Sequence, residues 1–316
     1  MKLSEAMQLF IRDRQLLYCS PKTIEGYNDV LGRFIRFTGD IELEELKIQI
    51  IRNYNAALVE RQISKASVGS YLRTIKAFIN YLEDNEYLPE GRLAKKIKVP
   101  RQPKKVIQLF TPEEVEKIFE AVEAEEEWLI VRNRLIIALM YDSGLRQGEI
   151  PKLTFKETDF ANKVMLVHGK GDKERLVPFG RVTDELLRDY MKLCPFKESE
   201  LLIIGRRGEP VTNDSIKKMM HRLSEKTGLV ELSCHKLRHN FATNWCIQGY
   251  ERDGYVDNIK LAVLMGHEDL ATTQRYMHAA QSIVSTTHFR SHLDDIIPRT
   301  SENSAQKPDS EEKPAN

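Results

Sequence analysis

The segment between residues 91 and 109, GRLAKKIKVPRQPKKVIQL, separates two stretches of different pattern and limits how this chain can fold. It contains two prolines and no acidic residue. Proline interrupts helices and central strands, and like charges repel one another. The pattern therefore predicts an extended basic linker between two domains. Its basic side chains are Arg92, Lys95, Lys96, Lys98, Arg101, Lys104 and Lys105.

Residues 1–90, before the linker, predict a small helical bundle without strands. Ser20 and Pro21 suit the cap and the first position of a helix. Apolar residues then recur at the helical period in two segments. These residues are Ile24, Tyr27, Leu31, Phe34 and Ile35 in the first segment, and Val68, Tyr71, Leu72, Ile75, Phe78, Ile79 and Leu82 in the second. Shorter helical patterns cover residues 2–16 and 45–61.

Residues 110–293, after the linker, predict a second domain that is mostly helical. A capping box at Thr111 and Glu114 opens it. Residues 164–168 and 174–179 alternate like two strands of a hairpin, and residues 201–204 are a candidate for a third strand. Helices are expected at 212–227, 233–248, 258–265 and 269–291. The predicted fold class is mainly α with a small antiparallel β-sheet, that is α+β.

Charge is distributed unevenly along the chain, although the net charge is only +1. Residues 1–109 hold 19 Lys and Arg against 13 Asp and Glu, a balance of +6. Residues 294–316 hold 3 against 6, a balance of −3, and are so polar that we expect a disordered acidic tail. A basic N-terminal part suggests a polyanionic partner, although charged faces are usually only solvated.

The composition also argues against several classes of protein. The cysteines lack metal-ligand spacing, so neither a zinc site nor a disulfide framework is predicted. They are Cys19, Cys194, Cys234 and Cys246. No run of 18 apolar residues predicts a membrane span, and the N-terminus lacks the apolar core of a signal peptide. The sequence therefore predicts a cytoplasmic protein.

Four short motifs in the second domain carry residues that could do chemistry. They are GLRQGE at 144–149, HGKGDKER at 168–175, HKLRH at 235–239 and GHEDLATTQRY at 266–276. Alone, each is more typical of a surface ion pair, a turn, a solvated basic helix or a core tyrosine. Together they supply two arginines, a lysine, two histidines and a tyrosine, without an acidic cluster of metal-binding type. Phosphoryl transfer needs such a set: cations on the phosphate oxygens, a nucleophile in line and an acid for the leaving oxygen.

These motifs, in this order over about 150 residues, resemble those of the tyrosine recombinases, also called the phage integrase family, and most closely the compact Xer-like members. The resemblance implies a helical core-binding domain followed by a catalytic domain. It implies that Tyr276 attacks DNA, forming a 3′-phosphotyrosine and releasing a 5′-hydroxyl. Arg146 and Arg238 would grip the scissile phosphate, and Glu149 would buttress Arg146.

The resemblance also implies roles for the other polar residues. Lys170 would protonate the leaving oxygen, with Lys173 as the weaker candidate for this role and a further DNA-binding residue. His235 would help to accept the tyrosine proton, and His267 would hydrogen-bond the phosphate. Because the phosphotyrosyl bond stores the energy of the phosphodiester, no metal, cofactor or ATP is implied. The segment at 249–258 is longer than the compact pattern of the family.

The implied partner is double-stranded DNA with paired recombination sites. The implied assembly is a tetramer, of one protein or of two related recombinases, in which residues 279–293 dock on a neighbouring subunit. The basic linker would then contact DNA phosphates. Chromosome-dimer resolution and the integration or excision of a mobile element both stay open. The alternatives are a type IB topoisomerase-like enzyme and a non-catalytic DNA-binding relative.

Overall fold

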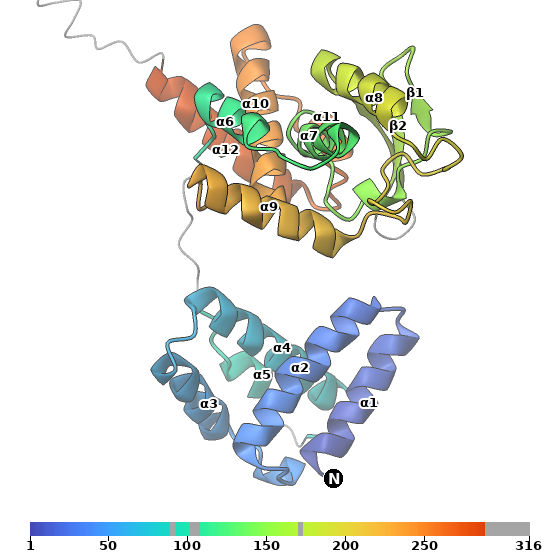
Figure 1. Ribbon diagram of the computed structural model, residues 1–316. Coiled ribbons are helices and arrows are strands. Elements are labelled where there is room, and N and C mark those ends of the chain that lie inside the picture. The colour runs from blue at the N-terminus through green and yellow to red at the C-terminus, as the bar shows by residue number, and fades with distance from the viewer. Residues whose placement is uncertain (89–92, 101–107, 170–172, 288–316) are drawn as a thin grey trace, which may run out of the picture. The chain divides into compact units, whose positions relative to one another are not determined.

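The computed structural model describes residues 1–88, 93–100, 108–169 and 173–287. The chain divides into two compact units, Met1–Lys105 and Val106–Asn316 (Figure 1). The expected disordered tail at 294–316 lies outside the described residues. None of the helices in the described ranges is long and apolar enough to cross a membrane.

The first unit is a helical bundle, which confirms the predicted fold class for this half. Its helices are α1 (Leu3–Leu16), α2 (Pro21–Thr38), α3 (Ile48–Glu60), α4 (Lys65–Asp84) and the short α5 (Leu93–Lys96), with a 3-10 turn at Leu43–Glu45. The Ser20 side chain accepts a hydrogen bond from the backbone of Thr23 and caps α2. The apolar faces of the helices meet in one core, where Phe34, Phe78 and Leu82 are fully buried.

The expectation of an extended linker over 91–109 is wrong for residues 93–99. Ala94 and Ile97 are buried in the core of the first unit, and the backbone of Ala94 donates to a carboxylate oxygen of Glu83 at 3.1 Å. The many lysines of this segment made its single apolar helical turn hard to recognise in the sequence. As a consequence, Lys95, Lys96 and Lys98 project from a packed segment and are exposed.

In the second unit, α7 (Glu127–Tyr141) lies at the centre and the other helices lie around it (Figure 1). These are α6 (Pro112–Glu120), α8 (Arg181–Leu193), α9 (Asn213–Thr227), α10 (Cys234–Asp253), α11 (Asn258–Met265) and α12 (Leu270–Thr287), with a 3-10 turn at Ile150–Lys152. The run from Leu135 to Met140 is buried throughout, so α7 packs on all sides, against α8 and α10 among others.

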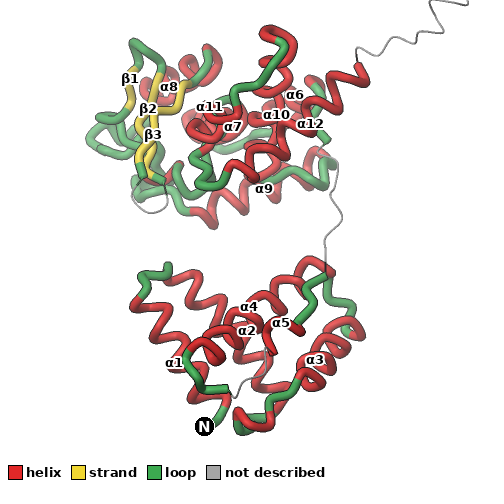
Figure 2. The backbone as a smooth tube through the Cα atoms, turned by 180° about the vertical axis from the view of Figure 1, so that it is seen from behind, coloured by secondary structure: helices red, strands yellow, loops and turns green. Residues whose placement is uncertain are grey.

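A three-stranded antiparallel sheet lies at one edge of this unit, beside α8 (Figure 2). Its strands are β1 (Thr158–Asp159), β2 (Val164–His168) and β3 (Glu174–Pro178). In the hairpin, Leu166 pairs with Leu176, as the alternating pattern predicts. The suggested third strand at 201–204 forms only isolated bridges, one of them from Leu201 to Thr154. The small sheet confirms the α+β assignment.

Helix α10 is one turn longer than expected and takes up half of the segment at 249–258. Gly249 does not end the helix. It lies close to the chain that returns, because a Cβ atom there would approach the carbonyl oxygen of Tyr255 to 3.3 Å. The helix instead ends at Gly254, which has a left-handed φ of 74°. The tight return brings α11 back beside α10, where the residues described below converge.

Candidate active site

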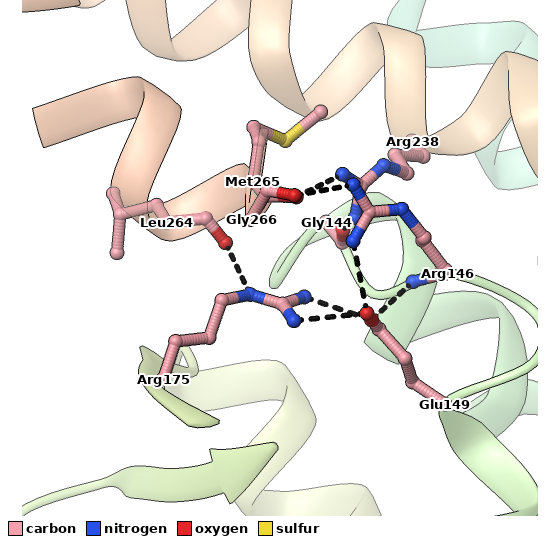
Figure 3. A network of polar contacts seen from close by, with 8 residues as sticks. All are labelled: Gly144, Arg146, Glu149, Arg175, Arg238, Leu264, Met265 and Gly266. Atoms are coloured by element: carbon pink, nitrogen blue, oxygen red, sulfur yellow. Dashed lines mark hydrogen bonds and ion pairs between the residues drawn. The ribbon is translucent and has the colours of Figure 1, made fainter. Parts of the chain in front are cut away.

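Three arginines from distant parts of the second unit converge on the carboxyl end of α11 (Figure 3). Arg146 follows α7, Arg175 lies in β3 and Arg238 lies in α10. Their guanidinium groups donate hydrogen bonds to the carbonyls of three consecutive residues, Gly266, Leu264 and Met265 respectively. The carboxyl end of a helix carries partial negative charge, so it is a suitable anchor for cations.

Arg146 is the most open of the three arginines, with 39% of its side chain exposed. Its Nη2 donates to the carbonyl of Gly266 at 2.7 Å, and its Nη1 donates to Glu149 Oε1 at 3.1 Å. The backbone N–H of Arg146 also donates to Glu149 Oε2, at 2.7 Å. Both the main chain and the side chain of Arg146 are therefore fixed, while more than a third of the side chain stays exposed.

Arg238 is only 3% exposed, and its guanidinium donates to the carbonyls of Gly144 and Met265. Burial, followed by repulsion from the Arg146 charge, lowers the pKa of Arg238 to about 9. Arg238 is still a cation at neutral pH, but it has few anions near it. An entering anion would stabilise such a group.

Among the described residues, Glu149 is the carboxylate that hydrogen-bonds these arginines. Its two oxygens accept hydrogen bonds from Nη1 and Nη2 of Arg175, both at 2.8 Å, in addition to those from Arg146. Burial by itself would raise the pKa of Glu149, but the hydrogen bonds and charge of Arg175, the backbone hydrogen bond from Arg146 and the charge of Arg238 together outweigh it, and the pKa is lowered. The sequence motif paired Glu149 with Arg146 alone, whereas the structure adds Arg175.

Tyr276 lies in α12, in the small core shared by α10, α11 and α12, and is 1% exposed. Its hydroxyl lies 2.6 Å from Nδ1 of His239 and accepts a hydrogen bond from Arg275 Nη2 at 2.9 Å. The Arg275 guanidinium also lies over the Tyr276 ring, 4.9 Å from its centre. The predicted proton acceptor, His235, contacts His239 instead, with ring centres 3.9 Å apart.

The histidines of the site lie among positive charges that disfavour their protonation. Burial, followed by the charges of Arg238 and Arg146, lowers the pKa of His267 to about 4. Its Nδ1 contacts Thr273 Oγ1 at 2.8 Å, and its ring stacks on Tyr276 with the centres 6.0 Å apart. Burial, followed by the neighbouring His235, lowers the pKa of His239 to about 3. Both rings are therefore neutral at pH 7.

The pKa of His235 is also lowered, although the residue is among the exposed ones. Partial desolvation by the surrounding protein is the largest cause, and the charges of Arg275 and Arg238 follow. His235 lies at the start of α10, one turn before Arg238. The predicted His235 thus lies beside the site, and the ring of His239 lies between it and the Tyr276 hydroxyl.

The predicted lysines are the part of the site that the structure describes least. Lys170 lies outside the described residues, as do the linker residues Arg92, Arg101, Lys104 and Lys105. Lys173 is described and forms an exposed ion pair with Glu268 at 3.0 Å. Within the described ranges, no group of three or more His, Cys, Asp or Glu is placed to hold a metal ion.

Three residues of this constellation were not among the predicted site residues: Arg175, His239 and Arg275. Each stands inside or beside a motif that the sequence analysis singled out, so the motifs themselves pointed to the right place. Their partners are 26 and 37 residues distant for Arg175 and His239. No local spacing rule connects residues so far apart.

Comparison with known proteins places both units in one family. Residues 108–282 match the phage integrase family, and residues 6–88 match the N-terminal SAM-like domain of phage integrases. Tyrosine recombinase XerC from Oceanobacillus iheyensis is 29% identical over 284 residues, covering 86% of this chain and 90% of that protein. Tyrosine recombinase XerC from Staphylococcus aureus strain USA300 is 30% identical over 282 residues, covering 86% and 91%.

Two solved structures show the same fold. XerH site-specific recombinase bound to a palindromic difH substrate aligns with a TM-score of 0.68 and 24% identity, covering 84% of this chain and 78% of that one. A lambda integrase dimer bound to a COC′ core site aligns with a TM-score of 0.71 and 18% identity, covering 88% and 95%.

Proposed function

Because the chain belongs to the phage integrase family and is a tyrosine site-specific recombinase, we propose that Tyr276, Arg146 and Arg238 form its catalytic centre on DNA. Recombinases of this type cut and rejoin DNA strands through a tyrosyl–phosphate bond. The observation that carries the residue assignment is the convergence of Arg146 and Arg238 on the carbonyls of Gly266 and Met265, with Tyr276 in the next helix and its ring stacked on His267.

Arg146 and Arg238 hold the two non-bridging oxygens of the scissile phosphate. A guanidinium has five N–H donors in a planar fork, so a side chain that gives two to the protein can give others to a phosphate. Charge develops on these oxygens as the nucleophile attacks, and fixed cations then stabilise it without reorganisation. The lowered pKa of Arg238 is consistent with this role, since burial and the Arg146 charge cause it and an entering phosphate would offset both.

The Tyr276 oxygen forms a bond to phosphorus while the bond from phosphorus to the 5′ oxygen breaks. The leaving oxygen takes a proton from Lys170, and the tyrosine proton passes to a histidine. His239 is better placed than His235 to receive it first, because its Nδ1 already contacts the hydroxyl at 2.6 Å. Since Tyr276 is buried, the hydroxyl must be uncovered before attack. His267 then adds a hydrogen bond to the phosphate.

The number of subunits in the active assembly follows from the chemistry of DNA strand exchange. Four strands must be cut and rejoined, so four copies act on two paired sites, either as one protein or as two related recombinases. Residues 279–293, which include the end of α12, dock on the neighbouring subunit. The basic positions at 92–105 and Lys173 contact DNA phosphates.

The assignment is tested by covalent trapping. Protein is incubated with nicked, sheared genomic DNA of the source organism in EDTA, then denatured, and the attached DNA is captured and sequenced. We expect fragments that share an inverted repeat, and none from Tyr276→Phe. Arg146→Ala should lower the cleavage rate by about 100-fold or more, the loss typical when a charge-stabilising donor is removed.

The control is Tyr255→Phe, because Tyr255 is 65% exposed and lies in the turn between α10 and α11, outside the group formed by the arginines, the histidines and Tyr276. It should trap DNA as the wild type does. Trapping by Tyr276→Phe at the wild-type level would refute the nucleophile assignment. The position of the repeat, near the replication terminus or at the edge of a mobile element, distinguishes chromosome-dimer resolution from element transfer.

A further inference from the structure

We propose that Arg175 is a positioning residue for DNA cleavage: it neutralises Glu149 and ties β3 to the end of α11, which keeps Arg146 and Arg238 oriented toward the phosphate. This inference rests on the proposed roles of those two arginines. It assigns a function to a residue that touches neither the phosphate nor the nucleophile.

Arg175 is fully engaged with the protein. Its Nη1 and Nη2 donate to the two oxygens of Glu149, and its Nε donates to the carbonyl of Leu264 at 2.8 Å. Only 6% of its side chain is exposed. Such a side chain cannot reach a DNA phosphate, so any effect that it has on cleavage must pass through its partners.

The first partner is the carboxylate of Glu149. Arg175 binds both of its oxygens at 2.8 Å, whereas the side chain of Arg146 binds one of them at 3.1 Å (Figure 3). Without Arg175, a buried carboxylate would have Arg146 as its nearest cation. Arg146 would then turn from the phosphate to pair with Glu149 on both oxygens, which is the preferred geometry of this ion pair.

The charges of the group support the same conclusion. Three guanidinium groups carry +3 and Glu149 carries −1, which leaves +2. A phosphodiester carries one negative charge, and the pentacoordinate state formed with a tyrosinate carries two. With Arg175 paired to Glu149, the remaining +2 belongs to Arg146 and Arg238 and matches that state. If Arg175 were removed, the excess would fall to +1.

The second partner is the end of α11. Leu264, Met265 and Gly266 each give a carbonyl to one arginine, so a shift of this turn moves all three contacts together. Gly266 has no side chain between the guanidiniums. A Cβ atom there would lie 3.1 Å from Arg146 Nη1 and 3.3 Å from Arg175 Nη1. The guanidinium groups of Arg146 and Arg175 are therefore packed against the same turn, and Arg175 connects this turn to β3.

The test is single-turnover cleavage by Arg175→Lys and Arg175→Gln on two DNA substrates. One carries an ordinary scissile phosphate. The other carries a methylphosphonate there, in which a neutral methyl group replaces one charged oxygen. Lysine keeps the charge of Arg175 but cannot bond both Glu149 oxygens and the Leu264 carbonyl at once. Arg181→Gln is the control, because Arg181 forms an exposed ion pair with Glu185 in the same unit.

Both Arg175 variants should bind DNA within about threefold of wild type and cleave the phosphate about 100-fold more slowly, since a charge-stabilising contact is lost. On the methylphosphonate the ratio of wild-type to variant rates should shrink to about tenfold or less, because less charge needs to be neutralised. A purely structural defect would slow both substrates equally. Arg181→Gln should match the wild type on both.

Three results would overturn the inference. These are wild-type cleavage by folded Arg175→Lys, an equal defect on the two substrates, or failure of both variants to fold, which would make Arg175 a stabilising residue only. Tyr276→Phe is run in parallel. If Tyr276→Phe cleaves, the proposed function fails in its nucleophile, whereas cleavage by the Arg175 variants with an inactive Tyr276→Phe refutes the positioning role alone.

Discussion

His267 shows how the arginines of the site affect stability at the scale of a single residue. Burial and the charges of Arg238 and Arg146 hold its pKa at about 4, below the ordinary 6.5. As pH falls from 7.5 to 5, the unfolded chain binds a proton at this residue and the folded chain does not. Stability is therefore full above pH 6.5 and is lost as pH falls toward 4. Because the ring is partly exposed, we expect a loss of about 1 kcal/mol from this residue by pH 5.

The measurement is urea denaturation at pH 7.5 and pH 5, a range above the ordinary pKa of carboxylates. His267→Gln should lose about 1 kcal/mol less than the wild type between these two values. His221→Gln is the matched control, because His221 is exposed on α9, outside the candidate site. Equal pH dependence in His267→Gln and the wild type would contradict the assigned environment of His267.

Individual residues also mark the limit of what the sequence could predict. Arg146 and Glu149 are three positions apart, and their ion pair was expected from that spacing. The contact of Arg175 with Glu149 depends on where β3 lies relative to the turn after α7. The contact of His239 with Tyr276 depends on the packing of α10 on α12. These are tertiary distances, and a single sequence has no local pattern that encodes them.

At the scale of elements, the turn after α7 depends on Gly144. This residue has a left-handed φ of 64°, and a Cβ atom there would clash with the ring of Phe241 in α10. Its carbonyl also accepts from Arg238. We expect Gly144→Ala to lower the free energy of unfolding by about 3 kcal/mol, from backbone strain and from displacement of Phe241. Denaturant unfolding measures this loss.

Gly228 provides the control for that substitution. It also has a left-handed φ, 70°, but nothing lies within 4 Å of the position of its Cβ. Gly228→Ala should therefore cost only the backbone term, about 1 kcal/mol. If the two alanine variants were equally stable, the close packing of Phe241 against Gly144 would not be the cause.

The elements themselves were largely predictable where periodicity and capping agreed. The capping box at Thr111 and Glu114 and the alternation in the hairpin both appear in the structure. The predictions of element boundaries were wrong where a residue type is compatible with two different structures. Gly249 permits a close approach within α10 and does not end it, and the apolar turn around Ala94 and Ile97 was concealed by lysines.

At the scale of the whole molecule, part of the positive charge of residues 1–109 lies on a packed segment. Ala94 and Ile97 fix α5 and the residues after it to the first unit, so Lys95, Lys96 and Lys98 present three exposed charges from a firm base. Lysines on a packed backbone lose less conformational entropy on binding than lysines on an extended linker would. This arrangement supports their proposed contact with DNA phosphates.

The salt dependence of DNA binding tests this surface. Each phosphate contact contributes about 0.9 to the slope of the logarithm of affinity against the logarithm of salt concentration. Replacement of Lys95, Lys96 and Lys98 by Gln should therefore reduce the slope by up to about 2.7. The cleavage rate of the bound complex should not change, because the lysines belong to the first unit and the catalytic arginines to the second. Lys192→Gln, which removes an exposed lysine paired with Asp189, should leave the slope unchanged. An unchanged slope in the triple variant would mean that these lysines are only solvated, and the DNA contact would then have to come from other basic residues.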